Sequence, residues 1–508
     1  MSTETAADRP EITYGNLRKP GLPGLFGLSA LQAVATAAAA MVLMVLCVMG
    51  QLVAAGVWFA LVAIALVPVL VPSRDEQNRY SKMGRWFSHA SARRKGKTLL
   101  RQGVAGRTPE GTCRLPGLAA QSQLSEFTDA YGRAFGLISI PRTHHHTVVI
   151  EANAPGTTGV DRESIDSQVA HWAAWLADLR QSGDIVAAAV VVETAPDSGQ
   201  RLRRFATRGL VQDAPEFSTA VLGEVLDTLP AGSAAISTRI AITFTGRPRV
   251  EGMGSKALST REMADEIATR LPGLVHRLGT TGAGTTCRAC TAQEIVDLTR
   301  VAFDPSAAAD VEQARLEGTG TGLTWKEAGP IAAQTNYESY VHESAISRTW
   351  QMQAPPRGVF YAATLKDLLS PHRDIARKRV ALLYRPEDPE ASATAVERDI
   401  NWSRWRASQK ERMTERARAD LEAAQKAARE EQAGASLVRF GMLVTATVLD
   451  EADMPMAEKA VVSNLAAPAR LKLRVAKGSQ DVAFMAALPL GVILPEHMRL
   501  PTSVREAL

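Results

Sequence analysis

The stretch "DIVAAAVVVET" (Asp184–Thr194) decides the fold class, because small and β-branched apolar residues follow one another without interruption. Such a run is typical of a β-strand that is covered on both faces. A second stretch, "AISTRIAITFTG" (Ala235–Gly246), alternates polar and apolar residues as a half-buried strand does. A helix is expected between them at Phe217–Leu229. The chain therefore alternates strands and helices here.

The same alternation continues on both sides of these strands. We expect a strand at His146–Asn153 and a helix at Ser164–Gln181, whose apolar residues recur with helical spacing. Another helix should begin after Ser259, because Glu262 completes a capping box. Together these elements predict a layered α/β (α+β) region with a sheet covered by helices. Residues 103–140, rich in Gly, Pro and Thr near their start, are interpreted as a linker entering it.

The layered region is expected to contain two α/β subdomains, at residues 103–320 and 321–508. In the second, strands are predicted at Ser347–Ala354, at Arg379–Tyr384 and within "LVRFGMLVTATVLD" (Leu437–Asp450). The segment from about residue 395 to 432 is rich in Ala, Glu, Arg and Lys and predicts one long, solvated helix. No internal repeat is evident in the sequence.

An uncharged segment precedes this region. From Leu25 to Pro72 the chain contains no Asp, Glu, Lys or Arg. The segment is more than twice the ~20 apolar residues that one helix needs to cross a bilayer. We therefore expect a hairpin of two transmembrane helices, at about 28–49 and 52–71, within an N-terminal membrane anchor that covers residues 1–102.

Positive charge is concentrated beside this hairpin. Residues 1–102 carry 12 Lys and Arg against 5 Asp and Glu, an excess of +7, whereas the whole chain is +5. Cytoplasmic flanks are enriched in Lys and Arg, so both termini are expected in the cytoplasm, with the chain in the inner (plasma) membrane. The remainder sums to −2, which argues against a nucleic-acid-binding surface. The residues of the basic collar, expected to contact lipid headgroups, are Arg74, Arg79, Arg85, Arg93, Arg94, Lys95 and Lys97.

Part of the collar looks like a phosphate-binding loop. The stretch "SARRKGKTLL" (Ser91–Leu100) contains Gly96-Lys97-Thr98, but a P-loop has a further glycine five positions before its Gly-Lys pair. That position is Ser91, and no apolar strand leads into it. We do not expect a nucleotide here.

Other candidates for chemistry are weak. Cys287 and Cys290 form one C-x-x-C without a second pair, and His144 to His146 have no carboxylate or thiol nearby to complete a ligand set. A metal role is therefore not expected at either place. No catalytic constellation is evident, and we expect no cofactor and no enzymatic activity.

Three passages, taken together, resemble a known family. "TYGNLRKPGLPGLFGLS" (Thr13–Ser29), leading into the hairpin, resembles PrgI-type membrane proteins of actinobacterial integrative conjugative elements, which are similar to the small VirB-type inner-membrane subunit. "LTWKEAGPIAAQTNYESYVHESAISRTWQ" (Leu323–Gln351) resembles the family's Trp-x-x-Ala-Gly-Pro element. "SQDVAFMAALPLG" (Ser479–Gly491) resembles the end of the N-terminal, non-motor domain of VirB-type secretion ATPases.

The resemblance implies a membrane subunit fused to the non-motor domain of a type IV secretion ATPase. Such a protein would be a scaffold for conjugative DNA transfer that docks a separate ATPase and other conjugation membrane subunits, forms homo-oligomers within the complex, and does not itself bind nucleic acid. The residues that carry the motifs, and are candidates for partner docking, are Trp325, Gly329, Pro330, His342, Trp350, Leu488, Pro489 and Gly491.

Three alternatives remain open. EccE, a component of type VII secretion, shares the two-span anchor and the composition, rich in Ala, Val and Arg. A membrane-tethered enzyme would bind a nucleotide or metal through the region after Gly103. A DNA-binding anchor would need basic patches such as Arg201–Arg208.

Overall fold

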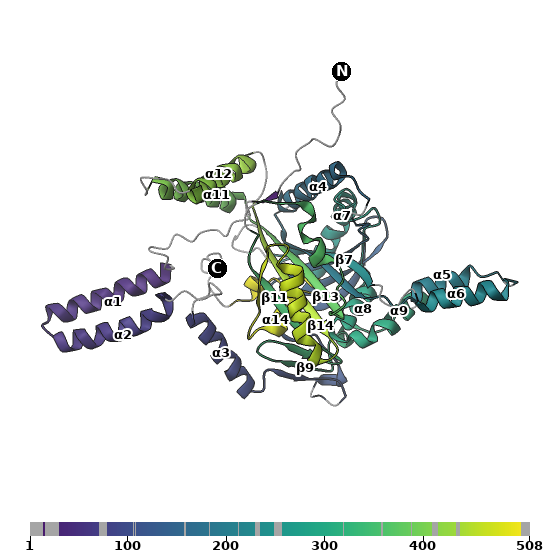
Figure 1. Ribbon diagram of the computed structural model, residues 1–508, viewed down its shortest axis with the longest axis horizontal. Helices are drawn as coiled ribbons and strands as arrows, with labels where there is room; N and C mark the ends of the chain where they lie inside the picture. The colour runs from purple at the N-terminus through teal and green to yellow at the C-terminus, as the bar shows by residue number, and fades with distance from the viewer. Residues whose placement is uncertain are drawn as a thin grey trace, which may run out of the picture. The chain divides into compact units, whose positions relative to one another are not determined.

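A large antiparallel sheet organises the larger of two units of the chain, which comprises residues 1–17, 97–392 and 433–498. The computed structural model describes residues 14–15, 30–70 and 79–498, with gaps at 105, 107, 157–158, 182, 212, 229–233, 248–256, 319, 357–358, 388, 409–414 and 433–436. Thirteen strands form the sheet (Figure 1), and every pair of neighbours runs antiparallel. The predicted mixed α/β architecture is confirmed.

The first half of the sheet contains the stretch that decides the fold. Its strands are β3 (Gln123–Thr128), β4 (Ala134–Ile140), β5 (His145–Ala152), β6 (Ile185–Pro196), β7 (Ala234–Thr245) and β8 (Arg288–Ala289). The strands expected near residues 146, 184 and 235 are thus confirmed. The interpretation of residues 103–140 as a linker was wrong for its second part, because β4 carries a buried apolar run, "AFGLISI".

The second half of the sheet follows later in the chain. Its strands are β2 (Leu99–Arg101), β9 (Ala332–Thr335), β10 (Tyr340–His342), β11 (Ala345–Ala354), β13 (Arg377–Pro386), β14 (Val438–Val448) and β15 (Lys472–Val475). The three strands predicted here correspond to β11, β13 and β14. A separate two-stranded pair joins β1 (Tyr14–Gly15) to β12 (Val359–Phe360).

The two halves repeat one topology, which the sequence did not reveal. Outward from the centre, the first half reads β6-β7-β5-β4-β3 and the second reads β13-β14-β11-β10-β9. The outer short strands match too, since β8 pairs with β5 and β15 pairs with β11. Because β6 and β13 pair antiparallel, this order is that of two halves related by an approximate two-fold axis through the middle of the sheet.

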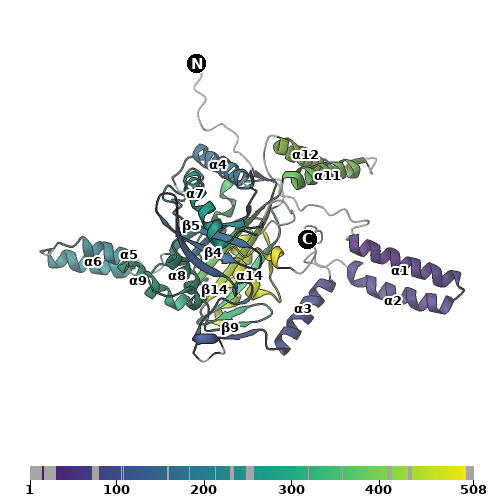
Figure 2. The same ribbon diagram turned by 180° about the vertical axis from the view of Figure 1, so that it is seen from behind.

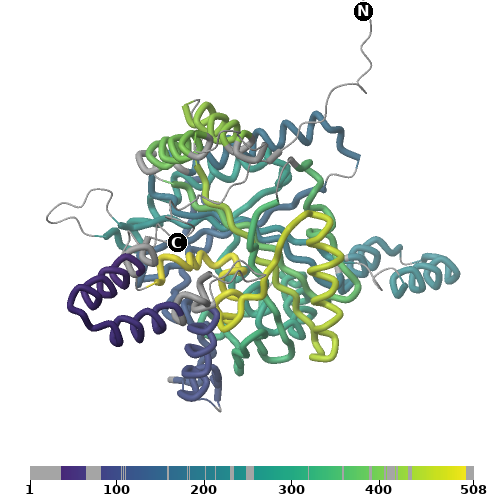
Figure 3. The backbone as a smooth tube through the Cα atoms, turned by 60° about the vertical axis from the view of Figure 1, so that its left-hand side comes forward, coloured from purple at the N-terminus to yellow at the C-terminus, as the bar shows by residue number. Residues whose placement is uncertain are grey.

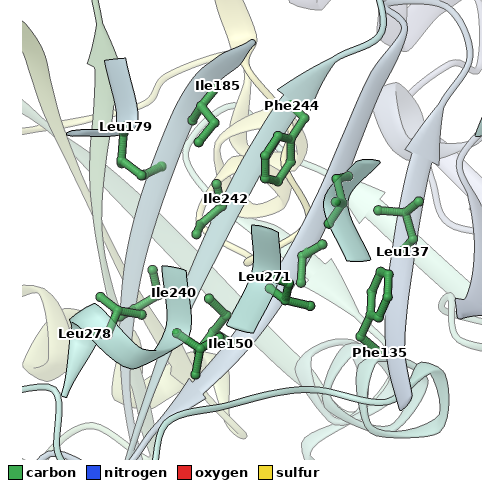
Figure 4. Packing of buried hydrophobic residues seen from close by; sticks show 14 of the residues in the cluster. Phe135, Leu137, Ile150, Leu179, Ile185, Ile240, Ile242, Phe244, Leu271 and Leu278 are labelled. Carbon is green, nitrogen blue, oxygen red and sulfur yellow. The ribbon is translucent and has the colours of Figure 1, made fainter. Parts of the chain in front are cut away.

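One face of the first half is covered by α4 (Arg162–Gln181) and α7 (Thr260–Leu278). Figure 4 shows Phe135, Ile150, Ile242 and Phe244 from the strands packing with Leu271 and Leu278 of α7. α7 begins at the predicted capping box: the Ser259 hydroxyl accepts from the Glu262 N–H, and the Glu262 carboxylate accepts from the Ser259 N–H at 2.7 Å.

The same face of the second half is covered in the matching way. α10 (Lys366–Leu369), α13 (Met454–Lys459) and the π-helical turn Ala460–Ala466 form a core with β11, β13 and β14. α8 (Ala292–Phe303) and α14 (Gln480–Ala486), which follow β8 and β15, pack instead on the opposite face. Figure 2 shows the sheet from behind. α9 (Ala308–Glu317) follows α8.

Each half carries one helical hairpin, inserted at the same place. β6 and β7 are joined through α5 (Gln200–Arg208) and α6 (Glu216–Thr228), and the insertion leaves and re-enters the sheet at the directly paired residues Pro196 and Ala234. β13 and β14 are joined through α11 (Pro389–Ser408) and α12 (Glu415–Gln432), between the paired residues Pro386 and Val438.

The prediction of one long helix at about 395–432 was therefore wrong. α11 and α12 are two helices that lie side by side (Figure 3, light green). The reason is the register of the sheet: a straight helix of that length would carry the chain roughly 55 Å away. The chain must instead return to the residue paired with Pro386.

The second unit comprises residues 18–96, 393–432 and 499–508. Its N-terminal part contains α1 (Ala30–Val48), α2 (Leu52–Leu70) and α3 (Arg79–Arg94). α1 and α2 form a hairpin in which the Trp58 indole N–H donates to the Ala39 carbonyl at 3.0 Å. Within the residues that the structure describes, no helix combines the length and hydropathy of a bilayer-spanning helix. The expected spans at 28–49 and 52–71 extend beyond those residues at 28–29 and 71.

Candidate docking surfaces and the buried polar cluster

The motif residues before β9 form a tightly packed corner. The Trp325 indole N–H donates to the Ser122 hydroxyl at 3.1 Å. Gly329 leaves no room for a side chain, because a Cβ there would lie 2.3 Å from the carbonyl oxygen of Arg114. Pro330 is buried, and its carbonyl accepts from the Gln102 amide at 3.2 Å. These residues fix the approach of the chain to the sheet.

His342 lies inside the core, on the same face of the sheet as α8 and α14. Its Nδ1 is 2.6 Å from the Phe303 carbonyl, which can only accept, so Nδ1 carries the proton. Nε2 then accepts from the Ser347 hydroxyl at 2.7 Å. Burial lowers the pKa of His342 to about 4, and its ring lies 4.8 Å from that of Phe484. The imidazole is therefore a neutral, fully bonded core group.

The neighbouring carboxylate serves a different set of partners. Glu343 accepts from the Arg300 guanidinium at 2.6 Å and from the Ile331 N–H at 2.6 Å. Arg300 also donates to the Gly329 carbonyl at 2.9 Å. This ion pair ties α8 to the corner that Trp325 and Gly329 begin, so His342 and Glu343 do not act as one pair.

The C-terminal motif covers the middle of the sheet. Leu488, Pro489 and Leu490 are buried beneath this face. Gly491 has a positive φ of 72°, and a Cβ on it would lie 1.8 Å from the Thr147 hydroxyl oxygen. Only glycine allows the chain to approach β5 this closely.

The structure brings seven of the eight motif residues to one face, and Trp350 to the other. Trp350 is 1% exposed and belongs to the core that β11 forms with α13. The motif side chains are thus mostly interior and support the fold. A surface for a partner has to be sought on other residues.

A cluster of charged groups lies where the two halves meet. Glu193 of β6 accepts from Arg377 at 2.8 Å and from Arg379 at 3.1 Å, both on β13, and its other carboxylate oxygen lies 3.6 Å from Arg239 of β7. Burial alone would raise the pKa of Glu193, but the three guanidinium groups outweigh it and lower the pKa to about 2. No feature of the sequence indicated this cluster.

Three cations surround one carboxylate, so the cluster retains an excess of two positive charges. Arg379 is 2% exposed, and burial lowers its pKa. Its guanidinium lies 5.5 Å from the centre of the Phe484 ring, a cation–π contact. Among the residues that the structure describes, its Nε and Nη1 have no hydrogen-bond partner. Glu193 therefore offsets part of the positive charge at the centre of the sheet.

The histidine and cysteine candidates are also mostly interior. Burial lowers the pKa of His145 to about 3 and that of His146 to about 4, and His146 Nδ1 lies 3.0 Å from the Ser139 hydroxyl. Burial raises the pKa of Cys290 to about 12 and also raises that of Cys287. Across the described ranges, no three His, Cys, Asp or Glu side chains are grouped to hold a metal ion.

The phosphate-loop-like stretch has the opposite order of elements from a P-loop. α3 ends at Arg94, a turn follows with Gly96 at φ 67°, and β2 begins at Leu99. A P-loop passes from a strand into a helix, so that the helix N-terminus faces the phosphate. Here the turn joins a helix C-terminus to a strand, and Lys97 is exposed.

The basic collar is a solvent-facing feature. Its members Arg93, Arg94, Lys95 and Lys97 are exposed, and Arg85 is half-buried on α3. The side chain of Arg79 and the whole of Arg74 lie outside the described residues. On α3 the collar adjoins Trp86 and Phe87, which are 54% and 58% exposed and pack edge to face. Exposed aromatic and cationic side chains on one helix are typical of a membrane interface.

Comparison with known proteins adds no assignment. No protein-family model matches the chain, and no curated protein matches it.

Proposed function

We propose that this protein is a non-catalytic scaffold of the inner membrane in a type IV secretion system for conjugative DNA transfer, and that it docks a separate ATPase. The observation that carries the membrane part is the exposed apolar surface of α1 and α2. Their exposed large apolar side chains include Met44, Val48, Leu52, Val53 and Phe59. Apolar patches of this extent are rare on soluble monomers and usually contact a membrane or a partner.

The collar supports the same orientation. A short charged stretch separates the uncharged segment Leu25–Pro72 from α3, which begins at Arg79 and carries cations beside Trp86 and Phe87. Cations beside the membrane contribute about 1 kcal/mol each to binding an anionic surface. Both flanks of the apolar hairpin would then lie on the cytoplasmic side, with the sheet unit attached there.

The scaffold role is supported by how the polar groups of the sheet unit are used. His342, Glu343 and Glu193 all serve internal hydrogen bonds or ion pairs. Glu343 holds the segment before β9 against α8, Glu193 links β6 to β13, and His342 packs against Phe484 of α14. A body built in this way can present surfaces to partners without any reacting group.

Two measurements test the membrane and scaffold claims. The full chain should remain in the membrane fraction after an alkaline carbonate wash, and the chain purified in mild detergent should not hydrolyse ATP. A chain that is soluble without detergent would contradict the anchor. ATP hydrolysis that purifies with the chain would contradict the scaffold.

A third measurement tests the secretion system. The tagged chain is captured in mild detergent from cells that hold its gene cluster, and the captured proteins are identified. Recovery of a hexamer-forming conjugative ATPase supports the proposal. Recovery of type VII components alone would assign the chain to the EccE-like alternative, which shares the two-span anchor.

A further inference from the structure

The hairpin of α5 and α6 leaves most of its large apolar side chains exposed. Among its described residues, α6 has none that is buried, and Phe205 and Phe217 are each 80% exposed. The exposed large apolar residues of the hairpin and its connecting loop are Leu202, Phe205, Leu210, Val211, Phe217, Val221 and Val225. These side chains need a partner that the sheet unit of the same chain does not supply.

The exposed stripe on α6 is distinct from the side that faces inward. Phe217, Val221 and Val225 are spaced four residues apart and form one stripe along the helix. Leu222 and Leu226 are half-buried and lie on a different side of the helix. α6 therefore has one apolar stripe that is half-buried and a second stripe that is left exposed.

The charges of the two helices are opposite. α5 carries four arginines and no acid, and α6 carries Glu216, Glu224 and Asp227 and no base. Within the hairpin, Arg203 of α5 pairs with Asp227 of α6 at 2.9 Å. Each hairpin thus offers both a basic and an acidic helix beside its exposed apolar residues.

We infer that the α5–α6 hairpin is a self-association arm, which pairs with the same hairpin of a second copy of this chain. In a two-fold pairing, α5 of each copy faces α6 of the other, so that arginines meet carboxylates twice. Two helical hairpins joined in this way form a four-helix bundle whose core takes up the exposed stripes. The inference does not depend on the proposed function.

The charge pattern favours a second copy over a lipid surface. The acids of α6, together with Asp213 in the connecting loop, balance the four arginines of α5. Helices that bind anionic membranes carry an excess of Lys and Arg on the polar face. The arm has no such excess, but it is complementary to itself.

Charge reversal tests the pairing directly. One variant of the full chain carries Arg204→Glu and Arg208→Glu, and the other carries Glu216→Arg and Glu224→Arg. The Arg203–Asp227 pair within the hairpin is left intact in both. Two differently tagged chains are co-expressed, purified in mild detergent, and captured through one tag, and the amount of the second tag is measured.

We expect wild-type chains to capture each other. When a variant is paired with itself, the amount of the second tag recovered should fall by at least about tenfold. When the two variants are paired with each other, capture should return, because each basic helix again faces an acidic one. A misfolded arm could not be restored in this way. The matched control is Arg142→Glu with Arg373→Glu, two exposed arginines outside the arm, which should not change capture.

Several outcomes would overturn the inference. The inference is wrong if wild-type chains do not capture each other. It is also wrong if a variant still captures its own copies, or if the two variants together do not restore capture. Loss of binding to anionic vesicles by the arginine variant, without any change in capture, would assign the arm to a lipid surface instead.

Discussion

Replacing Glu193 by Gln should strongly destabilise the sheet unit, because it removes a carboxylate that pairs with three guanidinium groups. Arg377 and Arg379 donate to Glu193 at 2.8 and 3.1 Å, and Arg239 lies 3.6 Å away. The substitution keeps the shape but leaves one buried and two half-buried positive charges without this counterion. Breaking a buried ion pair by removing one partner costs about 3–5 kcal/mol.

The lowered pKa of Glu193 gives a second, independent value for the stabilisation that the ion pairs contribute. Its pKa is lowered from the ordinary 4.5 to about 2, which corresponds to roughly 3 kcal/mol of stabilisation at neutral pH. Because the folded-state pKa is the lower one, this stabilisation is present above pH 4.5 and is lost as the pH falls toward 2. The Glu193→Gln variant lacks this component, so its stability should fall less steeply below pH 4.5 than that of the wild type.

The assay is chemical denaturation of the full chain in mild detergent, followed by the fluorescence of buried tryptophans such as Trp175 and Trp350. The matched control is Glu338→Gln, which removes an exposed carboxylate that pairs with Lys477 at 2.6 Å and should cost less than about 1 kcal/mol. If Glu193→Gln is no more costly than this control, the reasoning is refuted. The double variant Glu193→Gln/Arg379→Met should recover part of the loss, since it removes one of the uncompensated charges.

Three other changes test the remaining parts of the account. Gly491→Ala should reduce the free energy of unfolding by at least about 2 kcal/mol more than Gly132→Ala. Both glycines have positive φ, but only at Gly491 would the added Cβ clash with Thr147. Chemical denaturation of the two variants measures the difference in the free energy of unfolding. Burial lowers the pKa of His342 to about 4. Below pH 6.5 the imidazole is therefore protonated in the unfolded chain but stays neutral in the folded chain until the pH approaches 4. The protein therefore loses stability as the pH falls from 6.5 to 4. The unfolding temperature of the His342→Gln variant should fall less steeply with pH over this range than that of the wild type. An equal slope in the two proteins would contradict this prediction. Reversing the charges of the four exposed cations of the basic collar should let part of the chains insert with the opposite orientation, because Lys and Arg flanks set the side on which they stay. Orientation measured by protease protection of the sheet unit in sealed vesicles checks this, and an unchanged orientation would contradict the collar's role.

Strands and helices with a clear local pattern could be predicted from the sequence. The buried run at Asp184–Thr194 and the alternation at Ala235–Gly246 correspond to β6 and β7, and the Ser259–Glu262 box starts α7. β4 was not predicted, because the Gly- and Pro-rich residues before it resemble a linker. The long charged helix was divided because the chain must return to the strand that it left, which no local pattern shows.

The candidate sites show a similar division. The motif passages that suggest a family stand in the sequence, but their burial became visible only when the structure placed Trp325, Gly329 and His342 beside Phe484 and Gly491 on one face. The cluster around Glu193 could not be predicted, because its members come from β6, β7 and β13. Their proximity depends on strand order and register, which cannot be read from isolated charged residues in each strand.

The amino-acid sequence by itself determined which segments become strands and helices, where charge is absent, and where cations gather, because these properties depend on near neighbours in the chain. Tertiary structure alone decided that the two halves share one topology and meet at β6 and β13. It also decided that the inserted hairpins leave from equivalent strand ends. The physical reason is that strand pairing joins residues almost 200 positions apart, such as Glu193 and Arg379, through backbone hydrogen bonds that do not depend on a local sequence pattern.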